Sequence, residues 1–113
     1  MSVHVKDQEQ LNNRIRAELD ANPVILYMKG DKTFPQCGFS SRLVEILTKV
    51  GVNFATHDVL SDPEIRFGMK NFSNWPTFPQ LFVKGELVGG CDIISGMFES
   101  GDLQKLLKEK GAL

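Results

Sequence analysis

A chain of 113 residues with 42% apolar residues is long enough for one modest hydrophobic core but not for two, so we expect one domain over residues 1–113. A net charge of −1 argues against a nucleic-acid-binding protein, and no apolar run approaches the ~20 residues of a membrane span. Two cysteines are too few for a disulfide scaffold and fit a reducing, cytoplasmic setting, although a mature organelle protein would look the same.

Helical and strand patterns alternate along the chain. The first seven residues lack the apolar core of a secretory signal, and Asp7 with Gln10 forms a capping box at a helix start. In chain order, the spacing of apolar residues predicts a helix from Asp7 to Asn22, a strand over residues 24–28, a helix over 38–50, a strand over 53–59, a helix beginning at 61–64, a hairpin of strands 80–83 and 86–88, and short helices capped by Asp92 and Asp102. A strand–helix–strand unit followed by a hairpin implies an α/β fold, a mixed four-stranded sheet with helices on both faces.

Cys37 is the candidate nucleophile or metal ligand. Residues 37–40, Cys-Gly-Phe-Ser, have the layout of a Cys-x-x-Cys redox motif with serine in the second cysteine position. Ser40 cannot resolve a mixed disulfide, so the site keeps one sulfur without a local partner thiol. Cys37 lies where a helix is predicted to begin, and free N–H groups at a helix start favour a thiolate. The alternative is a buried, inert cysteine, which is common among free cysteines.

Two further segments carry features suited to a ligand. Residues 75–79, Trp-Pro-Thr-Phe-Pro, predict a rigid turn, and a cis peptide at Phe78-Pro79 would aim the backbone of Phe78 into a cleft, whereas most such bonds are trans. In residues 89–92, two glycines and Asp92 form a helix start suited to an anion, with an ordinary capped turn as the alternative. Cys91 is a core residue, a backup thiol or a second ligand, and we favour the core or a cleft wall.

Lys29 and Arg66 are candidate cations for a carboxylate. Lys29 ends the first strand and should lie near Cys37, and Arg66 lies in the first turns of the third predicted helix. Together they can clamp a carboxylate, with arginine able to make a bidentate contact, whereas the alternative for each is a solvated surface charge. His4 and His57 lack metal-ligand spacing, which predicts surface or strand positions for both.

These features together make the chain recognisable. It resembles the monothiol glutaredoxins of the thioredoxin superfamily, in particular the single-domain Cys-Gly-Phe-Ser class. Four segments carry the resemblance in order and spacing: residues 28–30, 34–40, 73–80 and 89–92. It covers nearly the whole chain, and residues 31–33 fall in a loop where such proteins vary. The resemblance implies a thioredoxin-like (glutaredoxin) fold and a single glutaredoxin domain.

The resemblance also implies a cleft that binds glutathione. The site residues that it implies are Cys37 as iron ligand or nucleophile, Lys29 and Arg66 for the glycine carboxylate of glutathione, Phe78 for backbone pairing with the tripeptide, and Cys91 and Asp92 for the γ-glutamyl end. The anion-binding features inferred above from the residues alone agree with this assignment.

Counting thiolates gives a functional hypothesis. A 2Fe-2S cluster takes four thiolates, whereas one chain offers Cys37 and at most Cys91. Two copies of Cys37 and two glutathione thiols complete the set, which predicts a cluster-bridged homodimer that binds, stores and transfers the cluster in iron–sulfur assembly and iron homeostasis. The resemblance adds BolA-like proteins, scaffold proteins and apo-client proteins as partners. The alternatives are a glutathione-dependent oxidoreductase that deglutathionylates proteins, with weak or no activity expected, and an iron-sensing adaptor.

Overall fold

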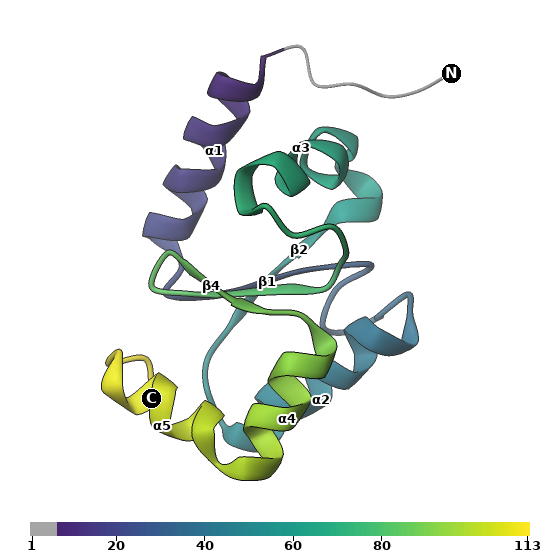
Figure 1. Ribbon diagram of the computed structural model, residues 1–113. Helices are drawn as coiled ribbons and strands as arrows, with labels where there is room; N and C mark the ends of the chain where they lie inside the picture. The colour runs from purple at the N-terminus through teal and green to yellow at the C-terminus, as the bar shows by residue number, and fades with distance from the viewer. Residues whose placement is uncertain (1–6) are drawn as a thin grey trace.

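The computed structural model describes residues 7–113, so the predictions about a secretory signal and about His4 lie outside the described residues (Figure 1). The elements are α1 (Gln8–Ala21), β1 (Val24–Met28), α2 (Gly38–Val50), β2 (Ala55–Asp58), a 3-10 turn (Val59–Ser61), α3 (Pro63–Ser73), β3 (Gln80–Val83), β4 (Glu86–Gly89), α4 (Cys91–Ser100) and α5 (Asp102–Glu109). None of the helices in the described part of the chain is long and apolar enough to cross a membrane.

The four strands form one mixed sheet in the order β2-β1-β3-β4. β1 pairs in parallel with β2 and antiparallel with β3, and β3 and β4 form a hairpin. Lys84 and Gly85 make its turn, both with positive φ, as a two-residue hairpin loop requires. The predicted α/β fold with a mixed four-stranded sheet is therefore confirmed.

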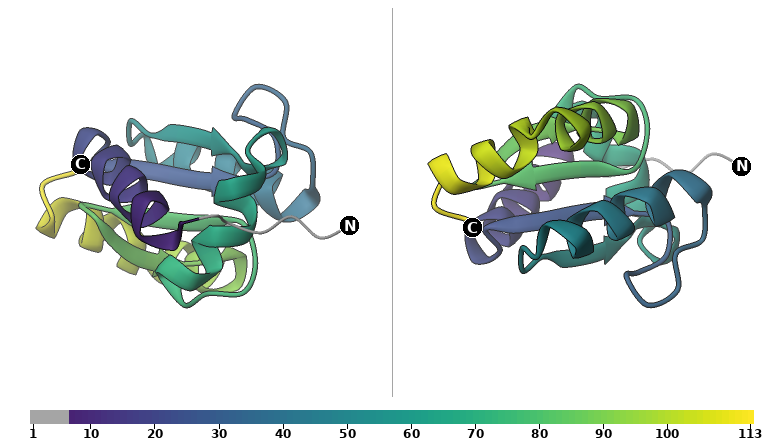
Figure 2. Two further views of the ribbon diagram at one scale, coloured as in Figure 1. Left: turned by 90° about the horizontal axis from the view of Figure 1, so that it is seen from above. Right: turned by 90° about the horizontal axis from the view of Figure 1, so that it is seen from below.

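Helices cover both faces of this sheet. α1 and α3 lie on one face, and α2 and α4 lie on the other, with α5 extending the second layer (Figures 1 and 2). β1 is buried along its whole length, and its side chains alternate between the layers. Leu26 and Met28 pack with α2, α4 and α5, whereas Ile25 and Tyr27 pack with α1 and α3. A central strand covered on both faces needs the continuous apolar run that the sequence shows.

Helix ends explain most of the element boundaries. The Asp7 side chain caps α1 by accepting hydrogen bonds from the backbone N–H groups of Glu9 and Gln10, as predicted. Gly51 ends α2 with a φ of +83°, a conformation that glycine adopts without strain. Asp62 caps α3, with Pro63 in the first turn, also as predicted.

The predicted caps of two helices and both predicted bounds of β2 are wrong, and β4 runs one residue past the predicted 86–88, to Gly89. The expected caps Asp92 and Asp102 lie inside the first turns of α4 and α5, because Gly90 and Gly101 take the N-cap positions. β2 spans Ala55–Asp58 rather than the predicted 53–59, and it ends where the Asp58 carboxylate accepts the N–H of Leu60 and turns the chain into the 3-10 segment. A side-chain-stabilised turn such as the one at Asp58 offers the backbone an alternative to continued strand pairing.

His57 links helix α1 to the start of helix α3. It lies on β2 as predicted, largely buried, with Nε2 2.7 Å from a carboxylate oxygen of Asp62 and Nδ1 2.8 Å from one of Glu18. Its ring stacks on Tyr27, and Arg14 also pairs with Asp62. Burial acts to raise the pKa of Asp62, but the hydrogen bonds from Arg14 and His57 outweigh it and hold that pKa below its usual range. This network fixes the N-terminus of α3, the helix that carries Arg66.

Candidate thiol and ligand-binding site

The loop between β1 and α2 brings Cys37 back to the end of β1. The N–H of Gln36 donates to the carbonyl of Lys29 at 2.8 Å, which closes the loop at its base. The N–H of Gly30 donates to a carboxylate oxygen of Asp58 at 2.9 Å and so ties the same point to β2. Cys37 therefore starts its helix beside the sheet rather than at the tip of a free loop.

Ser40 connects the sulfur of Cys37 to the strand end. The N–H of Ser40 donates to Sγ of Cys37 at 3.3 Å, so Cys37 is the N-cap of α2. The Ser40 hydroxyl oxygen lies 3.3 Å from the same sulfur and accepts the backbone N–H of Lys29 at 3.2 Å. Ser40 is fully buried, whereas Cys37 is partly exposed. The serine that replaces a second thiol thus contacts the sulfur directly.

The groups around the Cys37 sulfur determine the pKa of its thiol. Partial burial acts to raise the pKa of Cys37, but hydrogen bonds from the Ser40 hydroxyl and from the backbone at Ser40 and Phe39, together with the charge of Lys29, outweigh it. The pKa is therefore lowered from the ordinary thiol value. A partly exposed sulfur with a lowered pKa is suited to nucleophilic attack and to metal binding, rather than to the inert role that the sequence left open.

We expect Ser40→Ala to raise the pKa of Cys37, because the substitution removes the hydroxyl that stabilises the thiolate. At neutral pH the thiolate fraction falls, so Cys37 should react more slowly with iodoacetamide. The alkylation rate measured against pH gives the midpoint. Ser41→Ala is the matched control, since Ser41 is an exposed neighbour on the same helix turn. An unchanged midpoint in Ser40→Ala would show that the hydroxyl does not act on the sulfur.

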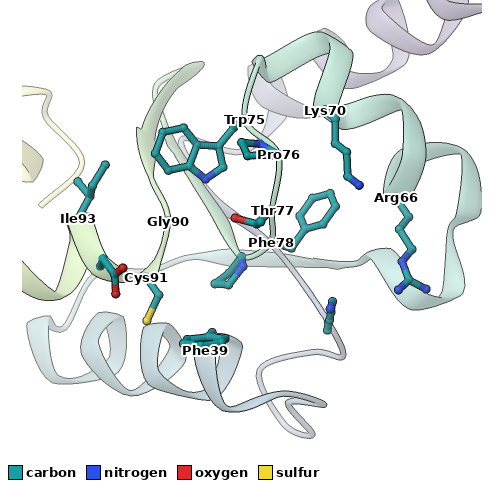
Figure 3. A pocket seen from close by; sticks show the side chains of 13 residues that line it. Phe39, Arg66, Lys70, Trp75, Pro76, Thr77, Phe78, Gly90, Cys91 and Ile93 are labelled. Atoms are coloured by element: carbon teal, nitrogen blue, oxygen red, sulfur yellow. The ribbon is translucent and has the colours of Figure 1, made fainter.

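A cleft of about 690 Å³ opens beside this thiol. Figure 3 shows Arg66 and Lys70 projecting from α3 on one side, Cys91 and Ile93 at the start of α4 on the other, and the segment 75–78 between them. Phe39 of α2 closes a further side. The cleft thus draws its walls from elements that are distant in the sequence.

The structure brings the predicted site residues together. The predicted residues that line the cleft are Lys29, Arg66, Phe78, Cys91 and Asp92. Cys37 does not line the cleft, but it lies two residues before Phe39, which does, and the Ser40 hydroxyl joins its sulfur to the backbone of Lys29, which lines the cleft as well. The expectation that Cys91 belongs to a cleft wall is confirmed, whereas the roles of these residues toward glutathione stay predictions.

Sequence reasoning missed three residues of the cleft. Lys70 lines it one helical turn after Arg66, and this four-residue spacing was the available signal. Phe39 and Ile93 are 63% and 42% exposed, and both face the same space. The sequence pattern assigns Ile93 to the apolar positions of its helix, so only the fold could show that it borders a cleft.

Both ends of the cleft carry groups that can bind an anion, and the carboxylate of Asp92 also lies at the α4 end. Arg66 and Lys70 supply cations at one end, and Lys29 is a third cation in the lining of the cleft. At the other, α4 begins after Gly90 with no side-chain cap, so backbone N–H groups of its first turn remain available to an anion. A Cβ atom at Gly90 would lie 3.2 Å from Nε1 of Trp75 and 3.3 Å from the Pro79 carbonyl oxygen, so glycine fits this crowded wall best.

Between these ends runs the segment that precedes β3. The peptide bond between Phe78 and Pro79 is cis, the less common of the two forms considered from the sequence. Both residues line the cleft, with Phe78 only partly buried. The site thus combines a thiol of lowered pKa, a cationic end, an uncapped helix start and an intervening stretch of backbone.

A mixed sheet with a cysteine at the start of the helix that follows β1 defines this molecule as a thiol protein of the thioredoxin-like fold. Residues 24–88 match the family model described as Glutaredoxin. Glutaredoxin 4 of Haemophilus ducreyi is 53% identical over 97 residues, which cover 86% of this chain and 91% of that protein. The chain belongs to the glutaredoxin family, and it is a monothiol glutaredoxin.

Longer relatives and solved structures extend the comparison. Monothiol glutaredoxin-S11 of rice is 51% identical over 102 residues, which cover 90% of this chain but only 21% of the rice protein. The solution structure of reduced poplar apo GrxS14 has a TM-score of 0.81 at 40% identity, covering 91% of this chain and 94% of that one. A buckwheat glutaredoxin–glutathione complex has a TM-score of 0.83 at 22% identity, covering 97% and 99%, and shows the likeness of fold alone.

Proposed function

We propose that this protein binds, stores and transfers 2Fe-2S clusters with glutathione as a co-ligand. The observation that carries the proposal is the environment of Cys37, an accessible thiol with a lowered pKa and a hydroxyl 3.3 Å away where a second thiol would be. Within residues 7–113, no group of three or more His, Cys, Asp or Glu side chains could hold a metal ion. The four thiolates of such a cluster would therefore come from two copies of Cys37 and two glutathione molecules.

The cleft supports glutathione as the missing thiol source. Glutathione carries a carboxylate at each end, and the cleft has cations at one end and the uncapped start of α4 at the other. Lys29 and Arg66 would hold the glycine carboxylate, the Phe78 backbone would pair with the middle of the tripeptide, and Asp92 with the backbone at Cys91 would hold the γ-glutamyl end. The buckwheat glutaredoxin of similar fold was solved as a glutathione complex.

A cluster held in this way is cargo rather than a resident cofactor. Half of its ligands would be exchangeable small molecules, which favours transfer to an acceptor. We therefore propose scaffold proteins as donors and apo-proteins as acceptors, with a BolA-like protein as an alternative partner to the second copy of this chain. A cytoplasmic location and roles in cluster assembly and iron homeostasis belong to the same proposal.

The alternative function is a glutathione-dependent oxidoreductase, which the lowered pKa of Cys37 also favours. The Cys37 thiolate would attack the glutathione sulfur of a glutathionylated protein and form a Cys37–glutathione disulfide. The protein sulfur would leave as a thiolate and take up a proton. A second glutathione thiolate would then attack the Cys37–glutathione disulfide and release oxidised glutathione. The enlarged loop of residues 31–36 before Cys37 would reposition this second glutathione. Its placement therefore favours cluster binding over turnover as an oxidoreductase.

Anaerobic reconstitution with iron and sulfide, with and without glutathione, tests the proposal. The carrier should give visible absorption and shift from monomer to dimer only when glutathione is present, and it should then pass the cluster to an apo-ferredoxin. A colourless monomer that rapidly reduces a glutathionylated peptide would instead favour the oxidoreductase. A cluster that forms but never transfers would favour the iron-sensing adaptor.

We expect Lys29→Ala to weaken glutathione binding about tenfold, the effect of losing one charge-assisted hydrogen bond, and to shorten the cluster lifetime. Isothermal titration with glutathione and the decay of visible absorption measure the two effects. Lys105→Ala is the control, because Lys105 is exposed on α5 and does not line the cleft. Equal affinity in Lys29→Ala and the wild type would remove Lys29 from the site.

A further inference from the structure

A fully buried glutamine begins β3, whose other residues are all apolar. Gln80 has no exposed surface, and it pairs with Tyr27 of β1 in the sheet. Apolar side chains are the usual occupants of such a position. Burying a polar amide is unfavourable unless its atoms are hydrogen-bonded. The presence of glutamine at this position therefore calls for a specific role.

The amide of Gln80 binds the segment that forms the cleft wall. Its Nε2 donates to the carbonyl oxygens of Trp75 and Thr77, each at 3.1 Å. The opposite orientation would set the amide oxygen against two carbonyls, so the contacts themselves fix which end is the NH₂ group. The amide oxygen is buried without a partner. Only the donor end of the side chain thus has partners.

The segment 75–79 has few other hydrogen bonds to hold its shape. In the described part of the chain, no backbone–backbone hydrogen bond involves these five residues. Pro76 and Pro79 have no N–H group to donate. The N–H of Trp75 donates to the Ser73 hydroxyl at 3.2 Å, at the edge of the segment. The two hydrogen bonds from Gln80 therefore hold the first and the middle residue of the segment, Trp75 and Thr77, just before Phe78.

We infer that Gln80 is a positioning residue, whose buried amide holds segment 75–79 in the shape that presents the Phe78 backbone to glutathione. The inference rests on the proposed glutathione binding and adds a residue that does not itself line the cleft. A wall that is already ordered loses less conformational freedom on binding. If the wall were free to move, only the fraction of molecules in the right shape would bind, and the apparent affinity would fall by that fraction.

Gln80→Met tests this role, because methionine keeps the length of the side chain and removes both donors. We expect glutathione affinity to fall about tenfold, the result if a tenth of molecules keep the competent shape. The backbone order parameters of Thr77 and Phe78, measured by NMR relaxation without glutathione, should fall from about 0.85 to below about 0.6. Leu107→Met also places a methionine at a fully buried position, on α5, but it removes no hydrogen bond. It should alter neither the affinity nor the order parameters.

Wild-type order parameters for Thr77 and Phe78 that are already low without glutathione would overturn the inference, even if Gln80→Met did not fold. A folded Gln80→Met with wild-type affinity and an ordered segment would overturn it as well. Failure of the proposed function is a separate outcome. A wild-type protein that does not bind glutathione would contradict that proposal, whereas the order parameters would still report whether Gln80 holds the segment.

Discussion

Cys37→Ser should abolish both the cluster and the dimer after reconstitution, while leaving the fold intact. The substitution removes the only protein sulfur that the proposal assigns to the metal. The fold should survive, because the N-cap of α2 accepts a hydrogen bond from the N–H of Ser40, and serine is among the preferred N-cap residues. Absorption spectra, size-exclusion chromatography and urea unfolding measure the three properties on the same sample.

Cys91→Ser is the companion variant that locates the sulfur. Cys91 lies on the cleft wall with Sγ 3.9 Å from the Ser95 hydroxyl, and the proposal uses its backbone rather than its thiol. Cys91→Ser should therefore still form a coloured dimer. A colourless Cys91→Ser, or a coloured Cys37→Ser, would show that the ligand set includes Cys91 and that one thiolate per chain is the wrong count.

Gly30→Ala should destabilise the protein by about 2–5 kcal/mol and disturb the thiol site. Gly30 has a φ of +85°, which costs an alanine roughly 1–2 kcal/mol. An added Cβ would also lie 2.4 Å from the carbonyl oxygen of Phe34 and 2.8 Å from the backbone nitrogen of Gln36. Relieving such overpacking typically costs a further 1–3 kcal/mol. Urea unfolding measures the loss, and the alkylation rate of Cys37 reports the displaced loop.

Gly51→Ala separates backbone strain from the steric clash. Gly51 has nearly the same φ, +83°, but a Cβ there meets no atom within 4 Å. We expect its cost to be limited to the roughly 1–2 kcal/mol of the left-handed conformation, with no change in Cys37 reactivity. Equal losses in the two alanine variants would mean that the loop after β1 opens freely and does not position Cys37.

The sequence predicts most of this fold because its strongest signals are local. The apolar run of residues 24–28 and the cap at Asp7 depend only on neighbours in the chain. The starts of α4 and α5 could not be predicted, because an aspartate near a helix start resembles a cap. The choice between Gly90 and Asp92 depends on where β4 ends. That end is set by pairing with β3 rather than by the residues themselves.

The candidate site was predictable where a motif or the resemblance named a residue. Lys29 and Arg66 were inferred as carboxylate-binding cations from their types and positions, the resemblance implied the same role, and both line the cleft. The contacts of Ser40 and Gln80 were not predictable, because both depend on burial against segments that only the folded chain brings close. A serine in the second position of the motif indicates a missing thiol, but it does not reveal that the hydroxyl contacts both Cys37 and the end of β1.

Native mass spectrometry of the reconstituted protein tests the ligand count most directly. The account predicts one dominant species whose mass corresponds to two chains, one 2Fe-2S cluster and two glutathione molecules. This complex should dissociate to the bare monomer when glutathione is removed. A cluster carried by a single chain, or by a dimer that contains no glutathione, would contradict it.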